Sequence, residues 1–147
     1  MTALHSTVPA VAAAIAALID AELGPEVQVS DGRPPTGELR PECVYVADAD
    51  GRDTVPVHKS GRKEREEDYQ LAVIVSVHLD QGTVAQAKAR AFELLAAVED
   101  VLADDPSLGD VDGLIHATAG RWHSETGWAQ GPVCVIGLEV DCLARIE

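Results

Sequence analysis

Apolar residues follow two different spacings along residues 69–102. From Tyr69 to Leu79 they recur at every second position, and from Val84 to Leu102 they recur at three- and four-residue spacing. The first spacing predicts a β-strand with one apolar face, and the second predicts an amphipathic helix of about five turns. Asp80-Gln81-Gly82 separates the two, and Thr83 suits an N-cap. We expect the strand and the helix to bury their apolar sides against each other.

The remaining chain gives weaker patterns of the same two kinds. A first amphipathic helix is expected from Val8 to Leu23. Strands are expected at 26–30, 43–47, 113–123 and 133–146. Turns or loops are expected at 31–41, 48–51 and 125–131. The last two strands should pair antiparallel. The order of helices and strands along the chain predicts an α+β fold. We expect a mainly antiparallel β-sheet with two α-helices packed on one face and an extended hairpin arm at about 48–68. One domain, 1–147, is expected.

Composition limits the partners that the protein can have. The chain of 147 residues has a formal net charge of −14, and aromatic residues make up 3% of it. The charge argues against high-affinity binding of free nucleic acid or of an anionic membrane, because both need clustered Lys and Arg. No stretch approaches the roughly 18 apolar residues of a membrane span, so no membrane role is expected. The scarcity of aromatics leaves few anchors for stacking a base or a flat cofactor.

No motif for catalysis, cofactor binding or metal binding stands out. The five histidines form no close-set pair, and His116 and His123, seven apart on one strand, are expected on opposite faces. Asp48-Ala49-Asp50-Gly51 looks like the opening of a calcium loop, but Lys59 stands where the bidentate Glu is needed. We therefore expect no catalytic residue, no cofactor and no metal. The three cysteines form no CxxC pair and are expected to be reduced and buried: Cys43, Cys134 and Cys142.

Charge reverses abruptly just before the strand at Tyr69. Lys59, Arg62, Lys63 and Arg65 are four of the eleven cations, and Glu66-Glu67-Asp68 follows them directly. One interpretation is a solvated hairpin tip, with these carboxylates at the surface. The other is a basic arm that contacts acidic surface on a neighbouring copy. In that case the subunit-interface candidates are Val55, Val57, Lys59, Arg62, Lys63 and Arg65.

Two carboxylates of the last strand share one of its faces. Glu139 and Asp141 are two residues apart, so both side chains project to the same side. A solvent-facing or interface pair is favoured over a catalytic dyad, because the other residues of a catalytic site are not evident. We treat both as acidic interface candidates.

The order of these segments resembles the tail terminator (tail completion, minor tail protein U-like) family of long-tailed bacteriophages. The resemblance covers roughly residues 8–146. Its parts are the first helix, the Pro/Gly-rich Gly32-Arg33-Pro34-Pro35, the charged run 61–67, the strand 69–75, the helix 89–99, the run Asp105-Pro106-Ser107-Leu108-Gly109 and the closing strand 140–146. The helix followed by the Asp105–Gly109 run, and then by the closing strand, is the most characteristic of these.

This resemblance implies a structural virion protein without enzymatic activity. Proteins of the family form rings, usually hexamers, that cap the tail tube and join it to the head–tail connector. The implied partners are other copies of the chain, the tail tube protein on one face and the connector or stopper protein on the other. DNA passes through the ring without specific binding, and Glu139 and Asp141 become candidates for lining the lumen. The implied location is the tail–neck junction of the virion, after assembly in the host cytoplasm.

Two alternatives remain open at the level of sequence. One is another head–tail neck component, such as a stopper or head completion protein, which differs from a terminator only in its place in the particle. The other is a protein of another class, either a small ligand-binding or hydrolytic α+β enzyme or a cytoplasmic oligomeric binding module of unknown ligand. The enzyme would need polar groups that converge in a pocket, and the sequence contains no such motif.

Overall fold

The computed structural model describes residues 5–54 and 64–147 of the chain. Its elements are α1 (Val8–Leu23), β1 (Gln28–Asp31), the 3₁₀ turn η1 (Thr36–Glu38), β2 (Glu42–Thr54), β3 (Arg65–His78), α2 (Val84–Asp104), β4 (Leu114–Trp128) and β5 (Pro132–Ile146). The strands form one sheet in the order β1-β2-β3-β5-β4. β1 and β2 are parallel, and all other neighbouring strands are antiparallel. The predicted α+β class is confirmed.

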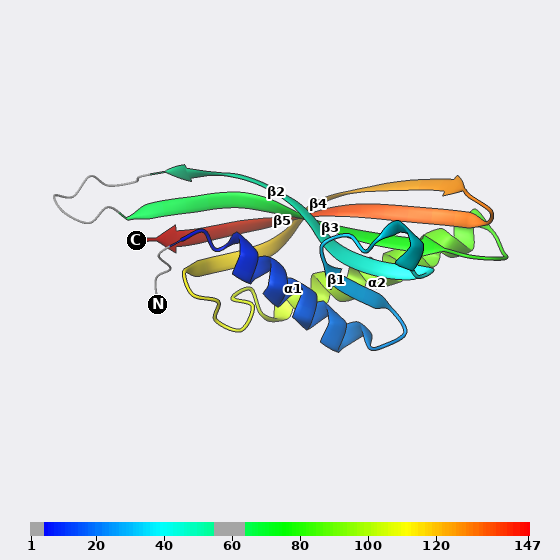
Figure 1. The fold of residues 1–147 in the computed structure, drawn as a ribbon, viewed down its shortest axis with the longest axis horizontal. Helices are drawn as coiled ribbons and strands as arrows, with labels where there is room; N and C mark the ends of the chain where they lie inside the picture. The colour runs from blue at the N-terminus through cyan, green and yellow to red at the C-terminus, as the bar shows by residue number, and fades with distance from the viewer. Residues whose placement is uncertain (1–4, 55–63) are drawn as a thin grey trace.

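Both helices lie on the same side of the sheet, as expected (Figure 1). Helix α2 begins with a capping box, in which the Thr83 hydroxyl accepts from the Gln86 backbone N–H and the Gln86 side chain accepts from the Thr83 N–H. Its buried stripe packs on β3, β4 and β5. A two-bond ion pair from Arg90 to Glu42, at 2.7 and 3.0 Å, ties α2 to the start of β2.

Strand β3 lies in the middle of the sheet and supplies much of the core. Its residues alternate between buried and less buried from Glu67 to His78, as the period-two pattern predicts. The strand starts at Arg65, four residues earlier than expected from the apolar pattern alone. The charged residues before Tyr69 therefore belong to the strand, and β5 pairs with them as far as Ile146.

Strand β2 is much longer than predicted. Residues 48–51 were expected to form a turn, but a bulge between Val46 and Ala49 lets the strand continue beside β3 to Thr54. Gly51 has a different role from a turn glycine: a Cβ there would collide with the backbone of Asp68 and with Tyr69. It permits close approach of β2 to β3. The described part of the expected arm is thus a pair of sheet strands, and residues 55–63 lie outside the described residues.

Strands β4 and β5 form an antiparallel hairpin, as predicted, with a shorter connection. The loop expected at 125–131 is strand up to Trp128, and only residues 129–131 make the turn. Gly131 has φ +139°, and a Cβ there would collide with the Leu79 carbonyl oxygen, so glycine is required at this turn. Bulges near Ile115 and near Gly120 shift the register of β4 twice.

The core lies between the sheet and the two helices. It is built from Val, Ile, Leu and Ala with Tyr69, as the composition predicts. Cys43, Cys134 and Cys142 are buried free thiols, as expected. Among the described residues, no helix is both long enough and apolar enough to cross a membrane.

Candidate assembly surfaces

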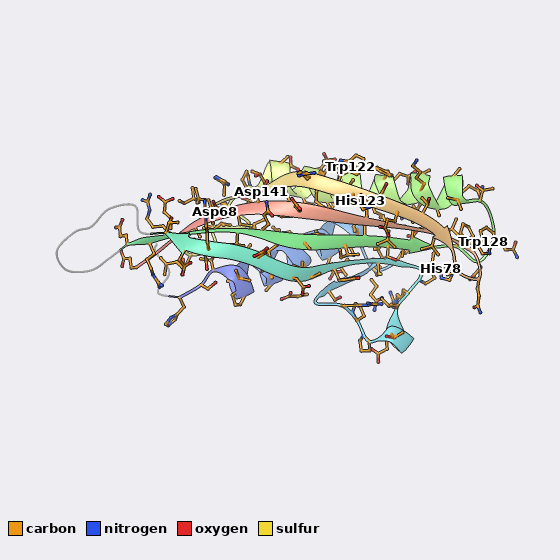
Figure 2. The ribbon with its side chains drawn as sticks, turned by 90° about the horizontal axis from the view of Figure 1, so that it is seen from above. Asp68, His78, Trp122, His123, Trp128 and Asp141 are labelled. Carbon is orange, nitrogen blue, oxygen red and sulfur yellow. The ribbon has the colours of Figure 1, made fainter. Side chains whose placement is uncertain are left out.

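The sheet face opposite the helices is the first candidate surface. Figure 2 views the sheet from this side, with both helices behind it. We call it the open face, and its central residues come from three paired strands: Gln70 and Ala72 of β3, Glu139 and Asp141 of β5, and Thr118 and His116 of β4. Because each strand contributes one side of its pleat, the buried apolar residues face the helices and the open face carries a mixture of polar and apolar residues.

The two predicted acidic candidates lie together on the open face. Asp141 pairs in register with Gln70 and Glu139 with Ala72, so both point away from the helices, as expected. Gln70 Nε2 donates a hydrogen bond of 3.1 Å to Asp141 Oδ1. Asp68, labelled beside Asp141 in Figure 2, adds a third carboxylate to the same face. Both Glu139 and Asp141 are half-buried by their neighbouring strands.

Most of the predicted basic arm lies outside the described residues. Of the six interface candidates, Arg65 alone lies within the described residues, where it begins β3 opposite Ile146. Its guanidinium contacts Asp53 of β2 at 3.5 Å, and both side chains are roughly half exposed, at 42% and 47%. Such an exposed pair adds little to stability. Val55, Val57, Lys59, Arg62 and Lys63 lie outside the described residues.

A buried polar cluster joins the start of α1 to β3. Glu67 is only 6% exposed, and its Oε1 accepts hydrogen bonds from the Thr7 backbone N–H at 2.8 Å and from the Thr7 hydroxyl at 2.7 Å. The Tyr69 hydroxyl lies 2.8 Å from the Thr7 hydroxyl. Since Thr7 uses its single hydroxyl hydrogen on Glu67, Tyr69 is the donor in that contact. The sequence indicated that Glu67 belongs to a solvated charge run, and this was wrong.

Burial around this cluster changes the acidity of its neighbours. It raises the pKa of the Tyr69 hydroxyl well above its usual range. It also raises the pKa of the Cys142 thiol, on the adjacent strand β5, to about 12. Tyr69 and Cys142 therefore stay protonated at neutral pH, and Cys142 is not a thiolate nucleophile.

A cavity lies beside this cluster. Its volume is about 340 Å³, and it is lined by Val8, Ala49, Gly51, Arg52, Asp53, Glu67 and Tyr69. Its described lining residues include no serine, cysteine or histidine, so among them there is no nucleophile–base pair of the usual kind. Within residues 5–54 and 64–147, no three His, Cys, Asp or Glu side chains are grouped to hold a metal ion.

Strand β4 carries an exposed apolar surface at one edge of the sheet. Among the described residues, the large apolar side chains with high exposure are Ile115 at 45%, Trp122 at 51% and Trp128 at 68%, and all three belong to β4. The Trp122 ring meets Phe92 of α2 edge-on, with ring centroids 5.2 Å apart. Trp122 is therefore held in place although half of it faces solvent.

The two histidines of β4 are on one face, contrary to the prediction. His116 pairs with Leu143 and His123 with Gly137, and these partners project to the same side of β5. The bulge near Gly120 inserts one extra residue between the histidines, which cancels the expected change of face. They remain far apart along the strand, and His123 contacts Glu125 at 3.3 Å. Although they share a face, the two histidines are therefore not placed to bind one metal ion together.

Sequence reasoning missed two features of these surfaces. Glu67 stands in period-two phase with Tyr69 and Leu71, and this phase was the available signal that it faces the helices. The edge position of β4 had no comparable signal, because strand order depends on pairing between distant segments.

Comparison with known proteins gives a likeness in fold. No protein-family model matches the chain, and no curated protein matches it. A solved chain from the "Virion of native gene transfer agent (GTA) particle" has the same fold, with a TM-score of 0.61 and 21% sequence identity. The match covers 96% of this chain and 98% of that chain. The likeness therefore extends over both chains almost from end to end.

Proposed function

We propose that this protein is a structural virion protein of a phage-like particle and that it forms a tail terminator ring. In this role it caps the tail tube, joins it to the head–tail connector and lets DNA pass through the ring. The observation that carries the proposal is the near end-to-end likeness in fold to a chain of the gene transfer agent virion. The order of segments that resembles tail terminators narrows it from virion protein to terminator.

The surfaces described above fit a role in assembly better than a role in chemistry. The described cavities lack a nucleophile with its base, and no group of metal ligands is present among the described residues. The distinctive features are instead an acidic open face and an apolar sheet edge. We infer that the open face lines the lumen. Fixed carboxylates there would repel the phosphates of passing DNA.

Ring formation is the first test of the proposal. Negative-stain images of the purified protein are expected to show six-fold rings with a central hole. Sedimentation measurements over a range of concentrations would give the mass of the same particles. A protein that stays monomeric at every concentration, both alone and with isolated tail tubes, would contradict the terminator role. Rings that bind the connector but not the tail tube would favour a stopper or head completion protein.

The basic arm gives a second prediction. We propose that its cations contact acidic surface on the neighbouring copy, in a head-to-tail contact that closes a ring. Replacing Lys59, Arg62 and Lys63 together with glutamate should raise the concentration needed for ring formation at least about tenfold, because three attractions become repulsions. Analytical ultracentrifugation at fixed ionic strength would measure this. Rings that form at the wild-type concentration would mean that the arm is only a solvated hairpin.

A further inference from the structure

The described sheet has two free edges, and they lie on opposite sides of it. Strand β4 is terminal and pairs only with β5. On the other side, β1 pairs with β2 only through Cys43–Val46, so no described strand pairs with the outer side of residues 49–54. Free edges present unpaired backbone N–H and C=O groups and are usually protected. Here β4 spans Leu114–Trp128 without lysine or proline, and its two bulges interrupt the edge without closing it. The strand exposes Ile115 beside the first bulge, and Trp122 and Trp128 after the second.

The directions of the two edge strands make them suitable partners for each other. Strands β2, β3, β5 and β4 are successive antiparallel neighbours, so β2 and β4 run in opposite directions. A second copy placed beside the first in the same orientation would therefore present its β2 antiparallel to β4. This contact joins two different surfaces, so it repeats from copy to copy and can close into a ring.

The register defines which residues would meet. Asp50 pairs with Gln70, Gln70 with Asp141, and Asp141 with Thr118, so these four form one row across the open face. In a copy at the same level, Asp50 would continue this row next to Thr118. Arg121, beyond Thr118 on the same face, would then lie diagonally across from Asp50, a spacing that long side chains can span.

Charge also favours a β4–β2 contact. Copies with a net charge of −14 repel each other, so contact is favoured where opposite charges meet. Within the proposed contact, residues 49–54 of β2 carry Asp50 and Asp53 with Arg52, whereas β4 carries Glu125 with Arg121. Asp53 already pairs with Arg65, so Asp50 and Arg121 are the opposite charges that the contact would bring together.

The geometry points to a second copy of this chain as the partner of the β4 edge. Residues 49–54 of that copy add to β4 antiparallel beside Leu114–Ala119, with Asp50 next to Thr118 and within reach of Arg121. The sheets of neighbouring copies would then continue one another around a ring. The inference rests on the ring of the proposed function, but it needs no tail or head partner.

Cysteine cross-linking tests this contact directly. A variant with both Asp50→Cys and Thr118→Cys should form, under mild oxidation, a ladder of covalent oligomers on a non-reducing gel, because each copy links to two neighbours. Either single variant should stay unlinked, since the three natural cysteines are buried. Covalent dimers from Thr118→Cys alone would indicate β4–β4 pairing and would overturn the inference. Rings seen in images without any ladder would overturn the edge contact but leave the ring intact.

Charge exchange provides an independent measurement without oxidation. Arg121→Glu and Asp50→Arg are each expected to weaken self-association about tenfold, and the double variant should recover most of the loss. Both side chains are exposed, so thermal unfolding should be unchanged. Asp20→Arg, which makes the same charge change at an exposed site on α1, serves as the control. If the double variant self-associates as weakly as the single variants, the Asp50–Arg121 pairing is contradicted. If the variants lose tail tube binding but self-associate normally, the β4 edge binds the tail tube protein and not a second copy.

Discussion

Replacing Glu67 with alanine is expected to lower the free energy of unfolding by about 3 kcal/mol, since hydrogen bonds to a charged group contribute about 1.5–3 kcal/mol each. The carboxylate of Glu67 accepts both the N–H and the hydroxyl of Thr7, at 2.8 and 2.7 Å. Thr7 and Glu67 are both buried, at 2% and 6% exposure, so the substitution removes the acceptor of two buried donor groups. Denaturant unfolding followed by circular dichroism would measure the loss.

Glu66→Ala is the matched control for this prediction. Glu66 precedes Glu67 in the same strand, is only half-buried and has no hydrogen bond to α1 among those described. Its removal should change the free energy of unfolding by no more than about 0.5 kcal/mol, which is usual for a surface substitution. Equal losses in the two variants would mean that the Thr7 contact does not stabilise the fold.

A double-mutant cycle would separate the Thr7–Glu67 contact from the other effects of each substitution. Thr7 is the N-cap of α1, yet its side chain makes no capping bond within the helix. The carboxylate of Glu67 instead accepts the backbone N–H of Thr7 itself, close to the positive end of the helix. Thr7→Ala combined with Glu67→Ala should cost at least about 1 kcal/mol less than the sum of the single losses. Additive losses would show that the two residues act independently.

The sequence predicted the elements whose apolar spacing is long and regular. Strand β3 and helix α2 lie close to their expected positions because burial on one side imposes the spacing directly. The course of β2 beyond Ala47 could not be predicted in this way. Residues 48–51 have the composition of a turn, and it is pairing with β3 that holds them extended. Local propensity is overridden there by contacts with residues about twenty positions away.

The candidate site was predictable to a smaller degree. Glu139 and Asp141 share the open face because a strand keeps its alternation. The same rule failed for His116 and His123, since one bulge residue reverses the alternation and nothing in the local sequence marks it. The burial of Glu67 depends on Thr7, sixty residues away, and only the folded chain brings them together. Surfaces that form by strand order, such as the β4 edge, need the topology first.

Converting the acidic open face to a basic one should produce the largest functional change. A variant with Asp68, Glu139 and Asp141 all replaced by lysine changes the charge of each copy by six units, on the face that we propose lines the lumen. Wild-type rings are expected to bind duplex DNA weakly or not at all. The variant rings should bind it at 50 mM salt and lose roughly 10³-fold in affinity by 200 mM, as phosphate contacts do. Fluorescence anisotropy with labelled duplexes would measure both affinities.

The shape of the DNA then distinguishes a lumen from an outer surface. Lysines inside a preformed ring can reach duplex DNA only through a free end, so linear DNA should bind and closed circular DNA should not. The matched control places three lysines at exposed positions on the helices, Asp20, Glu22 and Asp100, and should bind both forms equally. If the open-face variant also binds closed circles, the open face lies outside the ring and the acidic-lumen proposal fails. Where variant particles can be assembled, the same substitutions should slow DNA ejection. Carboxylates that repel the DNA phosphates would then be replaced by lysines that attract them.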